Sequence, residues 1–157
     1  MLRQATNALA TLGRAWRVIC VPLAILSTAP VAAQEANHTR VIVSSDNPVQ
    51  EMDRPEVARI FLGQVSQWKD GTKMRPVDQS MTSIARKDFS SAVLKRSLLV
   101  VSHYWQQQIF AGRALPPPVK ETDADVAEFV IATRGGIGYV SDDFPLPKGV
   151  KLVAILR

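Results

Sequence analysis

The fold of this chain is indicated most clearly by residues 60–71, which read IFLGQVSQWKDG. The stretch begins as the apolar end of a helix, and Gly63 follows as a residue suited to a helix C-terminus. Trp68 is then an aromatic side chain for the core, and the Asp-Gly pair at 70–71 predicts a turn. The glycine-rich segment 135–140, GGIGYV, follows far downstream. We interpret residues 60–71 as a rigid joint between elements of an α/β layer.

The residues before this joint predict a strand and then a helix. Residues 40–45 contain the run Val-Ile-Val, typical of a short buried strand, and the Asp-Asn-Pro sequence at 46–48 ends it with turn residues. Asp53 has the position of an N-cap, and Glu56 lies three residues later, where it can complete a capping box. The buried face of this helix is expected to consist of Val57, Ile60 and Phe61.

The residues after the joint predict further helices and short extended segments. A strand is expected at 74–77, weakened by Pro76, and the three prolines at 116–118 force an extended connection. Helical spacing of apolar residues then predicts two helices. The apolar face of the first consists of Phe89, Ala92 and Val93. The second ends at Gly112, and its apolar face consists of Leu98, Val101, Trp105 and Ile109.

The last third of the chain completes the alternation of helices and strands. Thr122 and Asp125 form a second capping-box pattern, for a helix with Val126, Phe129 and Val130 on its buried face. A strand is expected at 137–141. The nearly all-apolar run 150–156 predicts a strand that is covered on both faces.

The N-terminal region has the pattern of an export signal. Three arginines and no acidic residue precede the apolar run 18–33, which ends in Val-Ala-Ala. The run is shorter than the about 20 apolar residues that cross a bilayer, and two prolines interrupt it. We therefore predict a signal peptide over residues 1–33 and a mature domain over residues 34–157. An uncleaved anchor is the alternative.

Composition argues against several function classes. The chain has 19 lysine and arginine residues against 14 acidic ones, and without a basic tract among aromatics it gives no indication of nucleic-acid binding. The single cysteine, Cys20, lies in the predicted signal, so the mature domain is expected to have no disulfide, thiolate metal site or thiol nucleophile. His38 and His103 lack the partner residues of a metal or catalytic site. We expect no cofactor and no metal.

Several of these segments, in this order, resemble the phosphate-binding proteins of ABC importers. They are residues 60–63, Trp68, residues 70–71 and residues 136–140, together with Tyr104, Trp105, Gln108, Phe110, Gly112 and Pro117. The resemblance covers about residues 41–153. It implies an α/β fold, a single three-layer lobe of a type 2 periplasmic-binding fold, with a short mixed sheet flanked by helices and no segment left for the other lobe.

The resemblance also implies where an anion would bind. The ligand loop of that family has an arginine, three further residues and then serine, glycine and threonine. Counting back from Phe89, these positions are Gln79, Ser83, Ile84 and Ala85, so the serine alone is kept. Glutamine lacks the charge and fork of arginine, and isoleucine obstructs the close approach that glycine allows. We expect an eroded ligand loop.

The candidate ligand-binding residues are those at the start of the following helix: Ser80, Thr82, Ser83 and Arg86. The serines and the threonine are equally suited to capping that helix. Arg86 and Lys87 could replace the lost charge, but we favour solvated surface residues. Trp68 and Trp105 could be stacking platforms, but we favour core packing for both.

Two functions remain in view. The first is a non-catalytic, periplasmic, solute-binding-like protein that holds phosphate or another small anion weakly. The alternative is a periplasmic interaction or scaffold protein that has kept the lobe and binds no small anion. A hydrolase is not indicated, because no Ser-His-Asp spacing is present. A lone lobe exposes the face that a second lobe would cover, so we expect self-association or an envelope protein partner.

Overall fold

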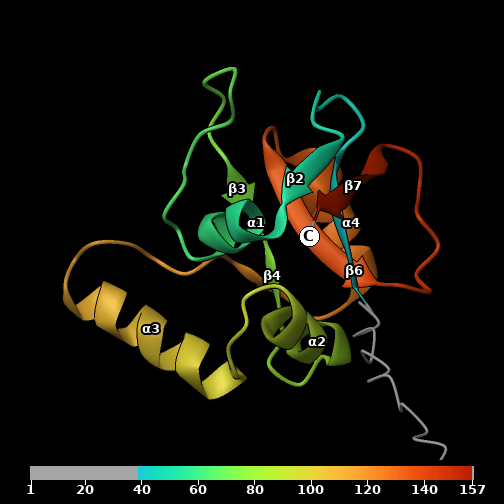
Figure 1. The fold of residues 1–157 in the computed structure, drawn as a ribbon. Helices are drawn as coiled ribbons and strands as arrows, with labels where there is room; N and C mark the ends of the chain where they lie inside the picture. The colour runs from blue at the N-terminus through green and yellow to red at the C-terminus, as the bar shows by residue number, and fades with distance from the viewer. Residues whose placement is uncertain (1–38, 157) are drawn as a thin grey trace, which may run out of the picture. The chain divides into compact units, whose positions relative to one another are not determined.

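The computed structural model describes residues 39–156, so the predicted signal peptide and His38 lie outside the described residues. The helices and strands of these residues, most of them labelled in Figure 1, follow in this order: β1 (Thr39–Ser44), β2 (Glu51–Asp53), α1 (Arg54–Phe61), β3 (Arg75–Pro76), β4 (Asp78–Gln79), α2 (Ile84–Ala92), α3 (Leu98–Phe110), β5 (Val119–Lys120), α4 (Asp123–Ala132), β6 (Gly136–Ser141) and β7 (Val150–Leu156).

The main sheet is mixed and has five strands in the order β2-β7-β1-β6-β3. β1 runs antiparallel to both of its neighbours, whereas β2 is parallel to β7 and β3 is parallel to β6. The chain leaves this sheet after β3, and β4 then pairs in parallel with β5. The predicted α/β fold with a short mixed sheet is confirmed.

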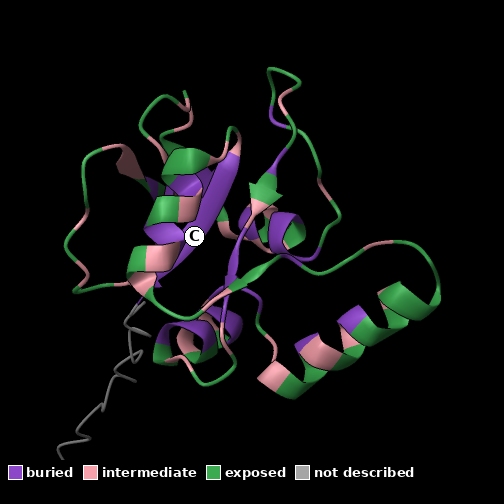
Figure 2. Ribbon diagram, turned by 180° about the vertical axis from the view of Figure 1, so that it is seen from behind, coloured by how far each residue is buried: buried purple, intermediate pink, exposed green. Residues whose placement is uncertain are grey.

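Helices cover both faces of this sheet. Because side chains alternate along a strand, Val41 and Val43 of β1 enter a large apolar cluster with Phe61 of α1 and Phe89 of α2. The intervening Ile42 packs with α4 residues in a second, smaller cluster. The central strands β1 and β6 are largely buried between these helices (Figure 2), and the predicted three layers are confirmed.

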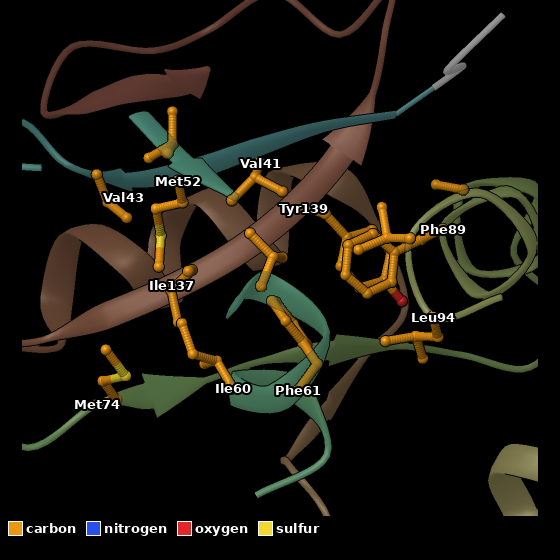
Figure 3. Packing of buried hydrophobic residues seen from close by; sticks show 14 of the residues in the cluster. Val41, Val43, Met52, Ile60, Phe61, Met74, Phe89, Leu94, Ile137 and Tyr139 are labelled. Atoms are coloured by element: carbon orange, nitrogen blue, oxygen red, sulfur yellow. The ribbon is translucent and has the colours of Figure 1, made fainter. Parts of the chain in front are cut away.

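Three aromatic rings join the helices to β6 in the larger cluster (Figure 3). The ring of Phe89 stacks on Tyr139 with centroids 3.9 Å apart, and Phe61 meets both rings edge-on. On the other face, a Cβ added to Gly138 would lie 2.6 Å from Val126 Cγ1. This glycine therefore lets α4 pack closely on β6.

The joint predicted at residues 60–71 is present. Gly63 follows α1 with a φ of +69°, which glycine adopts without strain. Trp68 is buried in the larger cluster, as expected, and its Nε1 donates to the Gly135 carbonyl at 3.1 Å. The backbone of Gly135 lies close to the Lys73 carbonyl: a Cβ added to Gly135 would be 2.1 Å from the Lys73 oxygen. The two glycine-containing segments thus contact each other through Trp68.

One of the two predicted capping boxes is wrong. Asp53 does occupy the N-cap of α1, but its side chain makes no capping hydrogen bond. Pro55 stands in the first turn and lacks one of the N–H groups that an N-cap oxygen would accept from. The second box is confirmed, since Thr122 and Asp125 bond to each other's backbone N–H groups.

Two expectations about burial also need correction. The strand β7 is not covered on both faces, because Leu152 and Leu156 are each 42% exposed. Its Val153 is buried, whereas α4 packs mainly on β6 and β1 and leaves much of β7 uncovered. In α3, Val101 and Trp105 are buried as expected, but Ile109 is exposed near the end of the helix.

Candidate functional site

The segment predicted to bind an anion joins β4 to α2. Ser83 is the N-cap of α2, and its Oγ accepts the Arg86 backbone N–H at 3.2 Å. The Ser83 N–H in turn donates to the Ser80 carbonyl at 2.9 Å, which closes a turn. The capping role that the sequence allowed for Ser83 is confirmed.

Gln79, which was expected to replace an arginine of the ligand loop, is buried and directed inward. Its Nε2 donates to Asp123 Oδ1 at 2.7 Å and to the Tyr139 carbonyl at 2.9 Å. Its Oε1 accepts the Ser83 hydroxyl at 2.6 Å. The Gln79 amide therefore links β4 by hydrogen bonds to α4, β6 and the start of α2. The hydroxyl proton of Ser83 is already donated to Gln79.

Arg86 is buried, which corrects the expectation of a solvated surface residue. Only 7% of it is exposed, and its Nη1 forms an ion pair with Asp78. It lies on the inward face of α2, one turn before Phe89. Lys87 is exposed, as expected. The sequence signal for this pair was an acidic residue, Asp78, directly after the apolar Val77 in an extended segment.

The carboxylate of Asp78 is shared by three donors. Besides Arg86, the Tyr139 hydroxyl and the Gln79 backbone N–H, at 2.9 Å, both donate to Oδ1. Burial, together with the negative charge of Asp78, raises the pKa of Tyr139 well above its usual value. Tyr139 is therefore a neutral donor to the Asp78 carboxylate.

Two hydroxyls of the loop face solvent. Ser80 Oγ and Thr82 Oγ1 lie 3.0 Å apart, and either can donate to the other. Ile84, the first residue of α2, is 78% exposed beside them. The structure thus brings Ser80, Thr82 and Ser83 together at one turn, while the Arg86 guanidinium is bound to Asp78. An anion here would meet hydroxyls and first-turn N–H groups beside an exposed apolar side chain.

The remaining candidates lie elsewhere. His103 is exposed on α3, and among residues 39–156 no three His, Cys, Asp or Glu side chains gather as a metal site. Trp105 is buried in the larger cluster, so the core packing favoured for both tryptophans is confirmed. Within the same residues, none of the helices has the length and apolar character needed to cross a membrane.

A hollow of about 770 Å³ lies away from these residues. It is bordered by segments within 44–51, 68–72 and 131–135. These segments include Trp68 of the joint and the turn between α4 and β6. None of the four candidate ligand-binding residues Ser80, Thr82, Ser83 and Arg86 lines this hollow.

Comparisons with known proteins identify the fold. A family model described as the PBP superfamily domain matches residues 14–156. No curated protein matches the chain significantly.

Solved structures of phosphate transport proteins have the same fold. An ABC-type phosphate transport receptor from Vibrio cholerae is 20% identical with a TM-score of 0.58, and the match covers 74% of this chain and 45% of that one. PstS from Borrelia burgdorferi is 14% identical with a TM-score of 0.59, with coverage of 75% and 47%. This chain therefore spans less than half the length of either protein.

Proposed function

The chain belongs to the PBP superfamily, and on that basis we propose that it is a non-catalytic, solute-binding-like protein of the periplasm with an eroded phosphate loop. The observation that carries the proposal is the inward direction of Gln79, whose amide is bonded to Asp123 and to the Tyr139 carbonyl. Neither this side chain nor Arg86 Nη1, which is paired with Asp78, is available to a phosphate at the loop.

The loss of affinity can be judged from the missing contacts. A hydrogen bond to a charged group contributes about 1.5–3 kcal/mol, and about 1.4 kcal/mol changes an affinity tenfold. Gln79 lacks the charge of an arginine, and the Ser83 hydroxyl already donates to it. Ala85 adds no side-chain donor. Weakening by several orders of magnitude is therefore expected, with any residual anion at Ser80, Thr82 and Ser83.

Incomplete enclosure of the ligand is also expected to weaken phosphate binding. The described residues form one lobe, and the chain covers 45% of the Vibrio cholerae receptor. One lobe supplies one wall of a ligand site, so a phosphate held here would stay hydrated on its other side unless a second protein surface covered it.

A second candidate function is favoured by the outer surface of α3. Phe110, at the end of this helix, is 91% exposed, and Leu99 and Leu115 are also exposed. Exposed apolar side chains of this size can contribute to an interaction site. A periplasmic scaffold that has kept the lobe and docks to a protein partner, or to a second copy, is consistent with this surface.

Isothermal titration with inorganic phosphate tests the eroded loop. The protein is purified as the producing cell processes it, and we expect weak binding or none. Ser83→Ala removes the capping hydroxyl, whereas Ser91→Ala changes an exposed serine of the same helix that lies outside the loop. Micromolar binding that is lost in Ser83→Ala and kept in Ser91→Ala would show that the loop is intact.

N-terminal sequencing tests the proposed export. We expect the mature chain to begin at Gln34 and to be found in the periplasmic fraction, because the Val-Ala-Ala sequence at 31–33 suits signal peptidase. An intact Met1 on membrane-bound protein would instead support the uncleaved anchor.

A further inference from the structure

A hollow lies where α2 leads into α3 (Figure 1). Its volume is about 610 Å³, and it is lined by residues within 87–99. None of the candidate ligand-binding residues at 80–86 lines it, and neither does Gln79. This hollow is therefore outside the loop at which an anion was expected.

The lining of this hollow is basic. Lys87, Lys95 and Arg96 contribute three cations, and none of the described residues that line it is acidic. Asp88, next to Lys87 in the chain, does not line the hollow. Both lysines are exposed, and the half-buried Arg96 lies over the Tyr104 ring, 5.5 Å from its centroid. The hollow therefore presents a positive potential to its surroundings.

The positive charge is concentrated on this part of the lobe. Residues 79–120 contain six lysine and arginine residues and one acidic residue. The other residues within 39–156 contain nine basic and twelve acidic ones. Even without Arg86, whose charge is balanced by Asp78, the segment that contains α2 and α3 keeps a positive net charge. A negatively charged surface is therefore attracted to this segment and repelled by the rest.

Apolar side chains lie beside these cations. Leu98 and Leu99, in the first turn of α3, also line the hollow, and Leu99 is 64% exposed. Cations next to exposed apolar side chains are typical of surfaces that bind the headgroup region of an anionic bilayer. A protein partner fits less well, because the centre of a protein interface is usually poor in lysine and rich in aromatic residues. None of the described residues that line this hollow is aromatic.

Another basic hollow lacks this combination. Lys73, Arg75 and Arg134 line it together with Asp70, and no large apolar side chain of the described residues contributes to it. It therefore provides a comparison surface with a similar number of cations.

From these features we propose that Lys87, Lys95, Arg96 and Leu99 form a surface that docks to an anionic lipid bilayer. The cations lie near the lipid phosphates, and Leu99 enters the headgroup region. Each cation near such a bilayer strengthens binding about fivefold, so three of them give reversible docking rather than a permanent anchor. The attraction depends on the charge density of the bilayer, so inorganic phosphate is not expected to bind here. The proposal goes beyond solute binding and is independent of the loop at 80–86.

Co-sedimentation with lipid vesicles tests the docking. The purified protein is mixed with vesicles of phosphatidylglycerol and phosphatidylcholine in equal parts, and separately with vesicles of phosphatidylcholine alone. We expect binding to the anionic vesicles only, and we expect added salt to weaken it, because salt screens exposed charges. Equal binding to both kinds of vesicle would overturn the proposal, since the cations would then contribute nothing.

A matched pair of charge reversals locates the surface. Lys87→Glu changes an exposed cation of the docking surface, and Lys73→Glu changes an exposed cation of the comparison surface. Lys87→Glu should weaken binding to anionic vesicles by at least about tenfold, whereas Lys73→Glu should leave it nearly unchanged. Leu99→Asn keeps the charge and should also weaken binding, because the apolar contact is lost. Equal losses in Lys87→Glu and Lys73→Glu would overturn the proposal, because binding would then follow the overall charge alone.

Polyglutamate distinguishes a bilayer from an acidic protein. It offers carboxylates but no apolar layer for Leu99, so we expect it to compete poorly with anionic vesicles. Polyglutamate that binds the protein when anionic vesicles do not would assign this surface to an acidic protein and overturn docking to a bilayer.

Discussion

At the scale of single residues, the ion pair of Arg86 and Asp78 links the start of α2 to β4 and is buried. Removing one partner of a buried pair leaves the other charge uncompensated and costs about 3–5 kcal/mol. We expect Arg86→Met to lower the free energy of unfolding by about this amount, measured by urea denaturation. Asp78→Asn combined with Arg86→Met should recover part of the loss, because no unpaired charge then remains.

The exposed neighbour Lys87 provides the control for this experiment. Lys87→Met changes the same helix and removes the same charge at a solvated position, so an effect within about 0.5 kcal/mol is expected. If Arg86→Met were equally mild, the guanidinium would have to be solvated, as the sequence alone suggested.

Tyr139 makes the fold sensitive to alkaline pH. Burial and the Asp78 charge raise the pKa of Tyr139 in the folded protein above the value of about 10 that an unfolded tyrosine has. Below pH about 10 both states keep the proton, and above it the unfolded state alone releases it. Stability should therefore fall as the pH rises past this point. Urea denaturation at several pH values should show a smaller fall for Tyr139→Phe, and parallel curves would contradict the assignment.

The sequence could predict the role of a residue only where that role depends on residues nearby in the chain. Ser83 and Thr122 were identifiable because an N-cap is defined by its own helix turn. The burial of Arg86 was not, because its partner Asp78 and the Tyr139 hydroxyl come from other elements. The inward direction of Gln79 was not identifiable either, because it depends on Asp123, which is 44 positions away.

At the scale of helices and strands, features set by neighbouring residues were again predicted better than features set by contacts between distant segments. The end of α1 just before Gly63 and the strand β6 follow from glycine positions and apolar runs. The separate β4–β5 pair was missed, because two-residue strands have no periodicity to detect. The open face of β7 was missed because composition does not say which strands a helix covers.

The packing of α4 on β6 depends on Gly138. An added Cβ would lie 2.6 Å from Val126 Cγ1 and 2.9 Å from Val77 Cγ1, both on stiff branched side chains. We expect Gly138→Ala to destabilise the fold by about 1–3 kcal/mol through overpacking, measured by thermal unfolding. Val126→Ala removes the closest atom, so the double variant should lose less stability than the sum of the two single variants. Additive effects would mean that the strand has moved away from α4.

At the scale of the whole molecule, the larger apolar cluster and the outer surface of α3 have different roles. The cluster buries one side of α3 through Val101 and Trp105, and the Tyr104 hydroxyl donates to the Leu62 carbonyl at 2.8 Å. These contacts hold the helix on the lobe. Figure 2 shows most of the remaining helix surface as exposed or intermediate. Phe110 and Leu99, at opposite ends of α3, are therefore available to another protein surface.

This surface leads us to expect self-association through α3. An exposed apolar patch tends to be covered in solution, and a second copy of the chain is always present to cover it. Light scattering of the purified protein should give a mass above that of one chain, decreasing on dilution. Phe110→Glu should shift the protein toward a monomer, because a charge buried in an apolar interface is costly. Gln107→Glu adds the same charge to the same helix at a residue that is already polar, and it should leave the mass unchanged. A monomeric protein at all concentrations would contradict self-association, and capture of a defined envelope protein that is lost in Phe110→Glu would assign the same surface to that partner.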